Sequence, residues 1–219
     1  MEKLIHIPVD SIELEGNLVI PEEAKAIVLF SHGSGSSRHS PRNNFVAEVL
    51  QKAGMATLLF DLLTEKEDEV YETRFNIPLL TKRLIETTKW LIKQKEIKKL
   101  KIGYFGSSTG AASALEAAAI LGDTIGAVVS RGGRPDLAME KLSAVKAPTL
   151  LIVGGNDGPV IEMNEAAMEK LKYEKKLEIV PGATHLFEEP GTLEKVSELA
   201  GKWFKRYLAI KNLTEVTPR

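Results

Sequence analysis

The stretch Lys101-Ile102-Gly103-Tyr104-Phe105-Gly106-Ser107-Ser108-Thr109-Gly110 decides the fold. It begins as an apolar run typical of a buried strand, and it passes directly into a segment of small residues that predicts a helix over 109–121. Residues 106–110 match the pattern G-x-S-x-G at this junction. A strand, a sharp turn and a helix around such a pattern form a nucleophile elbow, in which a strained backbone exposes a serine hydroxyl. Ser108 is therefore the candidate nucleophile.

The residues around Ser108 favour the elbow over an ordinary turn serine before a buried, alanine-rich helix. Gly106 and Gly110 lack the Cβ atoms that would clash as the turn closes. Alanines dominate the following helix, so that it can lie close against a sheet. The start of that helix also favours negative charge developing at the serine.

Further apolar runs of strand length recur along the chain, and amphipathic segments separate them. The runs lie at 26–30, 55–60, 101–105, 126–129, 149–153 and 177–180. Besides 109–121, helices are predicted around 45–50, 79–92, 161–171 and 193–208. Such alternation is typical of a parallel sheet that is covered on both faces.

The two ends of the chain depart from this alternation. Residues 1–20 predict an antiparallel edge hairpin, with strands at 4–9 and 11–20 and a turn near 15–17. Residues 211–219 are expected to form a frayed tail. No linker divides the chain, so we expect a single α/β domain over residues 1–219.

Composition excludes several classes of protein. The 219 residues carry 29 Lys and Arg against 30 Asp and Glu, a net charge of −1 that gives no sign of nucleic-acid binding. The absence of cysteine excludes disulfides, thiolate metal sites and a cysteine nucleophile. The chain shows neither a signal segment nor a transmembrane run, so we expect a cytoplasmic protein with no membrane partner.

A serine nucleophile needs a base, and the base needs an acid that orients it. Asp157 follows the predicted strand 149–153, and His185 follows the predicted strand 177–180. The order Ser, Asp, His and the position after strands both fit the triad, so Ser108, Asp157 and His185 are the candidate catalytic residues. Glu162 and Asp136 remain alternatives as the acid, although neither directly follows a strand. The other histidines, His6, His32 and His39, fit the base role less well.

Acyl transfer also requires donors for the oxyanion. One is expected from the N–H of Thr109, the residue after the nucleophile. The second is expected from the glycine-rich loop 31–37, with Ser34 as the first choice and Gly35 as the second. The competing interpretation of this loop as a phosphate-binding loop lacks the required pattern. We expect no cofactor and no metal site, because no two histidines have ligand spacing.

Two features bear on specificity. Arg131, Arg134 and Arg38 lie in loops on the same side of the sheet as the triad, where guanidinium groups would bind a substrate carboxylate or phosphate. The alternative is that they pair with nearby carboxylates such as Asp136 and Asp61. The acidic segment Leu62–Phe75 is either a solvated loop or a flap over the site.

The chain resembles the α/β-hydrolase fold, and within it the dienelactone hydrolase-like branch. The resemblance covers about residues 26–204 and rests on four motifs. They are Ser31-His32-Gly33-Ser34-Gly35, the elbow 106–110, the strand leading to Asp157, and Pro181-Gly182-Ala183-Thr184-His185. It implies a three-layer sandwich with an eight-stranded, mostly parallel sheet whose second strand is antiparallel. The length leaves no room for a cap domain.

The resemblance also implies that the triad acts on carboxylic esters or related small acyl compounds. Dienelactone hydrolases proper use a cysteine nucleophile, whereas this chain has Ser108 at that place. A serine indicates a general esterase. An acyltransferase or perhydrolase with the same triad, and a silent binding module on a hydrolase fold, are the alternatives. The sequence does not indicate an oligomeric state.

Overall fold

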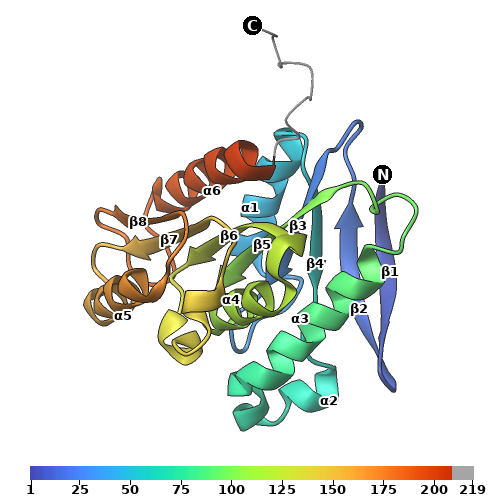
Figure 1. The fold of residues 1–219 in the computed structure, drawn as a ribbon, viewed down its shortest axis with the longest axis horizontal. Coiled ribbons are helices and arrows are strands. Elements are labelled where there is room, and N and C mark those ends of the chain that lie inside the picture. The colour runs from blue at the N-terminus through green and yellow to red at the C-terminus, as the bar shows by residue number, and fades with distance from the viewer. Residues whose placement is uncertain (209–219) are drawn as a thin grey trace, which may run out of the picture.

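The computed structural model describes residues 1–208, and the predicted tail at 211–219 lies outside the described residues. One sheet runs through the molecule with helices on both faces (Figure 1). Its strands are β1 (Glu2–Val9), β2 (Ile12–Val19), β3 (Ala26–Ser31), β4 (Ala56–Phe60), β5 (Lys101–Ser107), β6 (Ile125–Arg131), β7 (Thr149–Gly154) and β8 (Lys175–Val180). The α-helices are α1 (Pro41–Lys52), α2 (Glu65–Asp68), α3 (Ile77–Leu91), α4 (Thr109–Leu121), α5 (Gly158–Lys170) and α6 (Thr192–Leu208). Short 3₁₀ helices are η1 (Tyr71–Phe75), η2 (Gly122–Thr124), η3 (Pro135–Ala138) and η4 (Leu142–Ala144).

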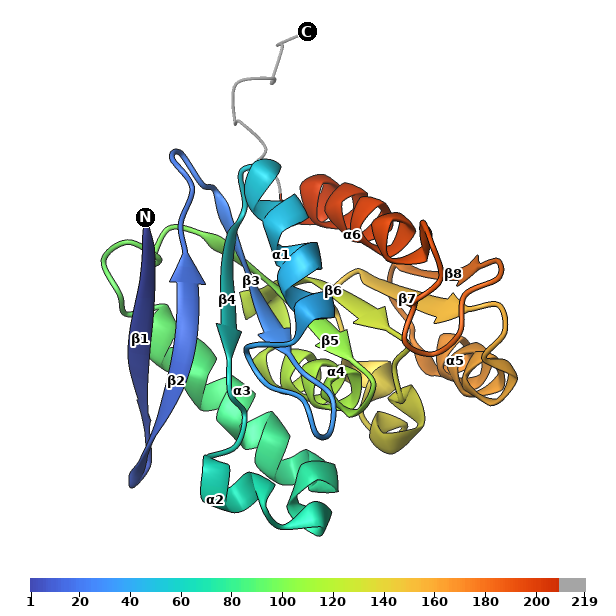
Figure 2. The ribbon, with the colours of Figure 1, turned by 180° about the vertical axis from the view of Figure 1, so that it is seen from behind.

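The strand order is β1-β2-β4-β3-β5-β6-β7-β8. β2 pairs antiparallel with β1 and β4, and the strands from β4 to β8 pair in parallel. This is the predicted α/β-hydrolase fold, with its eight-stranded sheet and antiparallel second strand. Within residues 1–208 no separate cap domain covers the sheet (Figure 2). None of the helices in this range has the length and apolar character needed to cross a membrane.

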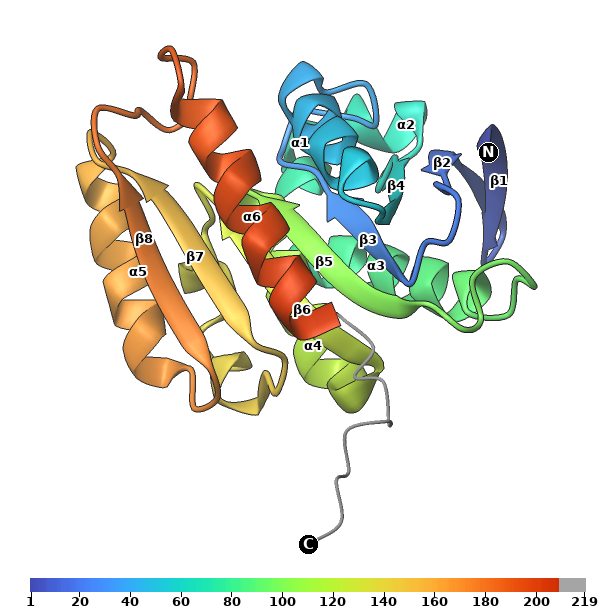
Figure 3. The ribbon, with the colours of Figure 1, turned by 90° about the horizontal axis from the view of Figure 1, so that it is seen from above.

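The two faces of the sheet carry separate hydrophobic cores, which explains why the strands read as continuous apolar runs. In β3, Ile27 and Leu29 belong to the core beneath α3, α4 and α5, whereas Val28 and Phe30 belong to the core beneath α1 and α6. Figure 3 shows these two sets of helices on opposite faces of the sheet. Alternate side chains of one strand therefore enter opposite layers. Each such apolar side chain contributes about 1.5–3 kcal/mol of burial free energy, so both layers help to stabilise the sheet.

The edge hairpin forms, but the position predicted for its turn at 15–17 is wrong. The chain reverses at Asp10–Ser11, where Asp10 has φ of 52°. Gly16 instead lies inside β2, opposite Phe60 of β4. A Cβ on Gly16 would lie 2.9 Å from Leu58 Cδ1, so the glycine serves close packing over the sheet rather than a turn.

The acidic segment 62–75 is folded into α2 and η1. Arg83 of α3 donates from Nη2 to Glu67 Oε1 at 2.7 Å. Arg74 donates from Nη2 to Asp68 Oδ2 at 2.9 Å and from Nε to the Asp68 carbonyl at 2.8 Å. Part of the acidic charge is thus paired within the fold, and the flap hypothesis stays a prediction.

Helix α4 and the end of β3 approach each other closely at the elbow. A Cβ on Gly110 would lie 2.1 Å from the Ser31 carbonyl oxygen and 2.4 Å from that of His32. A Cβ on Gly106 would lie 2.5 Å from Ala111 Cα. All three distances are shorter than any van der Waals contact allows. The predicted reason for glycine at these two positions is therefore confirmed.

Replacing Gly110 by alanine should destabilise the protein by about 3 kcal/mol or more, at or above the upper end for overpacking, because the added methyl group meets backbone atoms that cannot rotate away. The free energy of unfolding from denaturant titration measures this effect. Gly201→Ala is the matched control. In the interior of α6 its Cβ would lie 3.9 Å from Leu50 Cδ2, so alanine should stabilise by about 0.5–1 kcal/mol. A Gly110→Ala protein as stable as wild type would contradict the packing described.

Candidate active site

Ser108 stands at the junction of β5 and α4 in a strained backbone conformation. Its φ of 50° and ψ of −122° are unusual for a residue with a side chain. Three backbone hydrogen bonds hold it. Ser108 N–H donates to the Arg131 carbonyl at 3.2 Å, and the Ser108 carbonyl accepts from Arg134 N–H at 3.1 Å and from Ala111 N–H at 3.0 Å. The residue is partly exposed. The predicted elbow geometry is therefore present at the predicted serine.

His185 and Asp157 form a hydrogen-bonded pair at the ends of the two neighbouring strands. The distance between His185 Nδ1 and Asp157 Oδ2 is 2.7 Å, and 14% of the Asp157 side chain is exposed. A carboxylate accepts in such a bond, so Nδ1 carries the proton of this hydrogen bond and Nε2 lies outside it. Of the alternative acids, Asp136 is bound by Arg134 and Glu162 is exposed. Asp157 is the acid that contacts the histidine.

The loop after β6 brings His185 and Ser108 to the same place. A Cβ on Gly132 would lie 3.5 Å from both Nδ1 and Cε1 of His185, so the imidazole packs over this glycine. Gly132 follows Arg131, whose carbonyl holds the Ser108 N–H. Within residues 1–208 no direct hydrogen bond joins the Ser108 hydroxyl to His185. Such contacts commonly tighten only when substrate is bound.

The predicted oxyanion loop passes directly beside the serine. A Cβ on Gly33 would lie 3.1 Å from Ser108 Cβ. Thr109 is the first residue of α4, so its N–H has no acceptor inside the helix. The Ser34 N–H donates to Thr109 Oγ1 at 2.9 Å, whereas the Gly35 N–H has no acceptor within the described part of the chain. Thr109 N–H and Gly35 N–H are thus the open donors, and Ser34 is already engaged.

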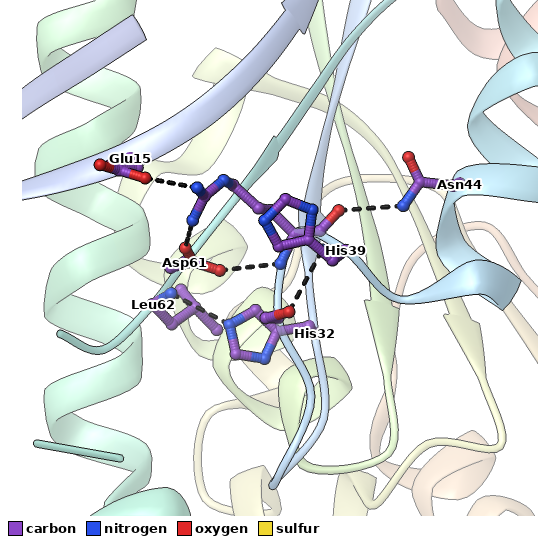
Figure 4. A network of polar contacts seen from close by, with 8 residues as sticks. Glu15, His32, His39, Asn44, Asp61 and Leu62 are labelled. Carbon is purple, nitrogen blue, oxygen red and sulfur yellow. Dashed lines mark hydrogen bonds and ion pairs between the residues drawn. The ribbon is translucent and has the colours of Figure 1, made fainter. Parts of the chain in front are cut away.

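His32 supports this loop, a role that the sequence did not reveal. Leu62 N–H donates to its Nε2 at 3.0 Å (Figure 4). Its Nδ1–H donates to the Gly33 carbonyl at 3.0 Å. The side chain is buried, and burial lowers the pKa of His32 against weaker opposing effects of Gly33 and Asp61. A neutral imidazole therefore links the oxyanion loop to the end of β4. A histidine at the start of a glycine-rich loop is the only signal that the sequence offers.

Stability should fall as the pH drops below about 6.5, the pKa of an unfolded histidine. Below that pH the unfolded chain binds a proton at His32, whereas the folded protein does not, because the pKa of His32 is lowered in the folded state. Denaturant unfolding between pH 8 and pH 5 measures this slope. His32→Gln should be less stable at pH 8 and should show a shallower slope. His39→Gln, exposed in the same loop, controls for the loss of an imidazole. Equal slopes in wild type and His32→Gln would refute the assignment.

Two of the three arginines predicted to bind substrate are paired with carboxylates. The guanidinium of Arg38 donates to the carboxylates of both Glu15 and Asp61. Its backbone N–H also donates to Asp61 Oδ1 at 2.8 Å. Arg134 donates to both carboxylate oxygens of Asp136, at 2.9 Å and 2.8 Å. These arrangements match the alternative of internal pairing.

The third arginine, Arg131, is buried rather than placed at the mouth of a pocket. Only 5% of it is exposed. Its Nη2 donates to Asn43 Oδ1 and to Ser107 Oγ, both at 3.1 Å. Burial, and then the nearby charge of Arg42, lower the pKa of Arg131 to about 10.

A groove of about 620 Å³ adjoins the oxyanion loop. Loop 32–39, the segment 61–68 and the start of β2 line it. Carboxylates outnumber cations in its wall. The carboxylates are Glu13, Glu15, Asp61, Glu65 and Asp68, and the cations are Arg38 and Lys66. The potential in the groove is therefore negative on balance.

Comparison with known proteins identifies relatives over most of the chain. The profile of the dienelactone hydrolase family matches residues 14–209. A crystal structure of dienelactone hydrolase from Anabaena variabilis is 57% identical and superposes with a TM-score of 0.94, covering 95% of this chain and 99% of that one. Est1E from Butyrivibrio proteoclasticus is 19% identical with a TM-score of 0.81, covering 94% and 99% of the two chains. The second likeness shows the fold alone.

A Mycobacterium tuberculosis protein named "Putative phosphoribosyl transferase" is 54% identical over 204 residues. The match covers 93% of this chain and 46% of that protein. The chain thus spans about half the length of the curated relatives it matches. That name belongs to the longer protein as a whole.

Proposed function

Since the chain belongs to the dienelactone hydrolase family, we propose that it is a serine hydrolase that cleaves carboxylic esters through an acyl-enzyme. The family and the fold are those of hydrolases. The observation that carries the finer proposal is the strained backbone of Ser108. Such a conformation costs about 1–3 kcal/mol and persists at functional sites, where it presents a side chain to substrate.

In the proposed mechanism, His185 Nε2 takes the proton from the Ser108 hydroxyl as the oxygen attacks the ester carbonyl. Asp157 holds Nδ1–H and stabilises the imidazolium that forms. The N–H groups of Thr109 and Gly35 stabilise the oxyanion. The imidazolium then protonates the leaving alcohol. Water, deprotonated by His185, hydrolyses the acyl-enzyme and restores Ser108.

In this mechanism the Ser34 N–H does not bind the oxyanion but holds the side chain of Thr109. Its hydrogen bond to Thr109 Oγ1 joins the oxyanion loop to the first turn of α4. One of the two open N–H groups is that of Thr109 itself, and the other belongs to Gly35, the residue after Ser34. The bond therefore fixes the spacing between the donors before substrate arrives, which favours stabilisation of the transition state.

Ser108→Ala should lower kcat for a p-nitrophenyl ester by on the order of 10⁶, and Asp157→Asn by about 10⁴, as in other triads. A fluorophosphonate probe, which phosphonylates activated serines, should form an adduct on Ser108 that mass spectrometry locates. Ser143→Ala, an exposed serine of η4, should behave as wild type. A folded protein that forms no adduct would instead indicate a silent binding module.

The charges of the site favour neutral ester substrates over acid-bearing ones. Arg38 and Arg134 are already paired, and the groove beside the oxyanion loop is negative on balance. A carboxylate entering it would meet an unfavourable Coulomb energy on the order of 1 kcal/mol or more. We expect kcat/KM for p-nitrophenyl butyrate to exceed that for mono-p-nitrophenyl succinate by roughly tenfold at low salt. The difference should shrink at high ionic strength, whereas a preference for the succinate would contradict it.

A further inference from the structure

Arg131 is a buried cation whose hydrogen bonds go to neutral groups. Its side chain ends in the protein interior, and within residues 1–208 it forms no ion pair with a carboxylate. Its Nε is buried and also lacks a partner among these residues. Burying an unpaired charge is costly, and proteins seldom keep such a group without a use for it.

The guanidinium closes a three-membered network beneath the elbow. Ser107 Oγ–H donates to Asn43 Oδ1 at 3.0 Å, and Arg131 Nη2 donates to both of these oxygens at 3.1 Å. All three side chains are buried. One Nη2 group therefore spans two acceptors, and every oxygen of the network is satisfied.

This network joins the three segments that make the site. Ser107 is the last residue of β5 and directly precedes Ser108. Asn43 lies in the first turn of α1, which follows the oxyanion loop. Arg131 ends β6, and its carbonyl also accepts the Ser108 N–H. Arg131 thus holds the elbow twice, by its backbone at Ser108 and by its side chain at Ser107.

The surroundings leave the charge of Arg131 uncancelled. Arg42, whose charge acts on it, is itself a cation and is paired with Glu188 at 3.0 Å. Even with a pKa of about 10, Arg131 stays protonated at neutral pH. The hydrogen bonds it donates are therefore charge-assisted and stronger than those of a neutral donor.

We propose that Arg131 is a positioning residue that holds the strained Ser108 elbow in register with the oxyanion loop through Ser107 and Asn43. This role rests on the proposed function of Ser108 as a nucleophile. A strained conformation survives only where its neighbours over-determine it, and the network supplies that restraint. Because Arg131 is buried, it acts on the reacting serine and not on substrate binding.

The test compares Arg131→Met, Arg131→Lys and wild type with p-nitrophenyl butyrate and with the fluorophosphonate probe. Methionine fills the space without donating, and lysine keeps a charged donor but lacks the planar, pre-organised guanidinium. In Arg131→Met, kcat should fall by about 10²-fold while KM changes by less than about twofold, since the nucleophile moves but binding is unaffected. The rate of probe labelling should fall by the same factor. Arg131→Lys should recover kcat to within about tenfold of wild type.

Arg83→Gln is the matched control, because Arg83 is also buried and also has an unpartnered Nε, yet it bonds Glu67 away from the elbow. It should lose stability without a change in the labelling rate at a temperature where it stays folded. Circular dichroism verifies folding of each variant. If Arg131→Met does not fold, Arg131→Lys carries the test: a roughly tenfold lower kcat at unchanged KM supports the proposal.

The outcomes separate this proposal from the proposed function. Suppose that the probe labels wild type on Ser108. A folded Arg131→Met protein that is then labelled as fast as wild type, or that differs from it mainly in KM, overturns the role of Arg131 alone. An unchanged kcat in Arg131→Lys, where only that variant folds, overturns it as well. A folded wild type that forms no adduct overturns the proposed function and, with it, this role.

Discussion

The structure depends on how closely the first turn of α4 lies against the end of β3. At this contact the backbone of Gly110 fills the space where any side chain would meet the carbonyl oxygens of Ser31 and His32. The chain passes from β5 to this position through the strained backbone at Ser108. The same approach brings Thr109 Oγ1 to the Ser34 N–H. The position of Ser108, the loop 31–37 and the start of α4 thus meet at one close contact.

Much of the fold could be predicted from the sequence, because the buried strands leave a clear pattern. Strands covered on both faces favour apolar residues at nearly every position, so β3, β4 and β7 appear as near-continuous apolar runs. The edge hairpin was harder to predict. Gly16 resembles a turn glycine, yet what requires it is the packing of Leu58 across the sheet. A contact with another strand leaves no trace in the local sequence.

Some residues of the candidate site could likewise be predicted from the sequence, and others could not. Ser108, Asp157 and His185 follow strands in a fixed order, which a single sequence shows directly. His32 and Arg131 act through contacts with residues far along the chain, such as Leu62 and Asn43. Charged and polar residues are mostly exposed, so the general expectation for Arg131 was the surface. Its burial depends on tertiary packing that no periodicity encodes.

The packing of the elbow has a consequence for how a family of enzymes can change its chemistry. The tight contacts fall on the glycines around Ser108 and on backbone atoms, not on the oxygen of its side chain. An exchange of that oxygen for sulfur would leave these contacts in place. Serine and cysteine members can therefore share one scaffold and differ mainly in the acidity and nucleophilicity of a single atom. A change from one residue to the other at this position would alter reactivity without requiring a change of the fold.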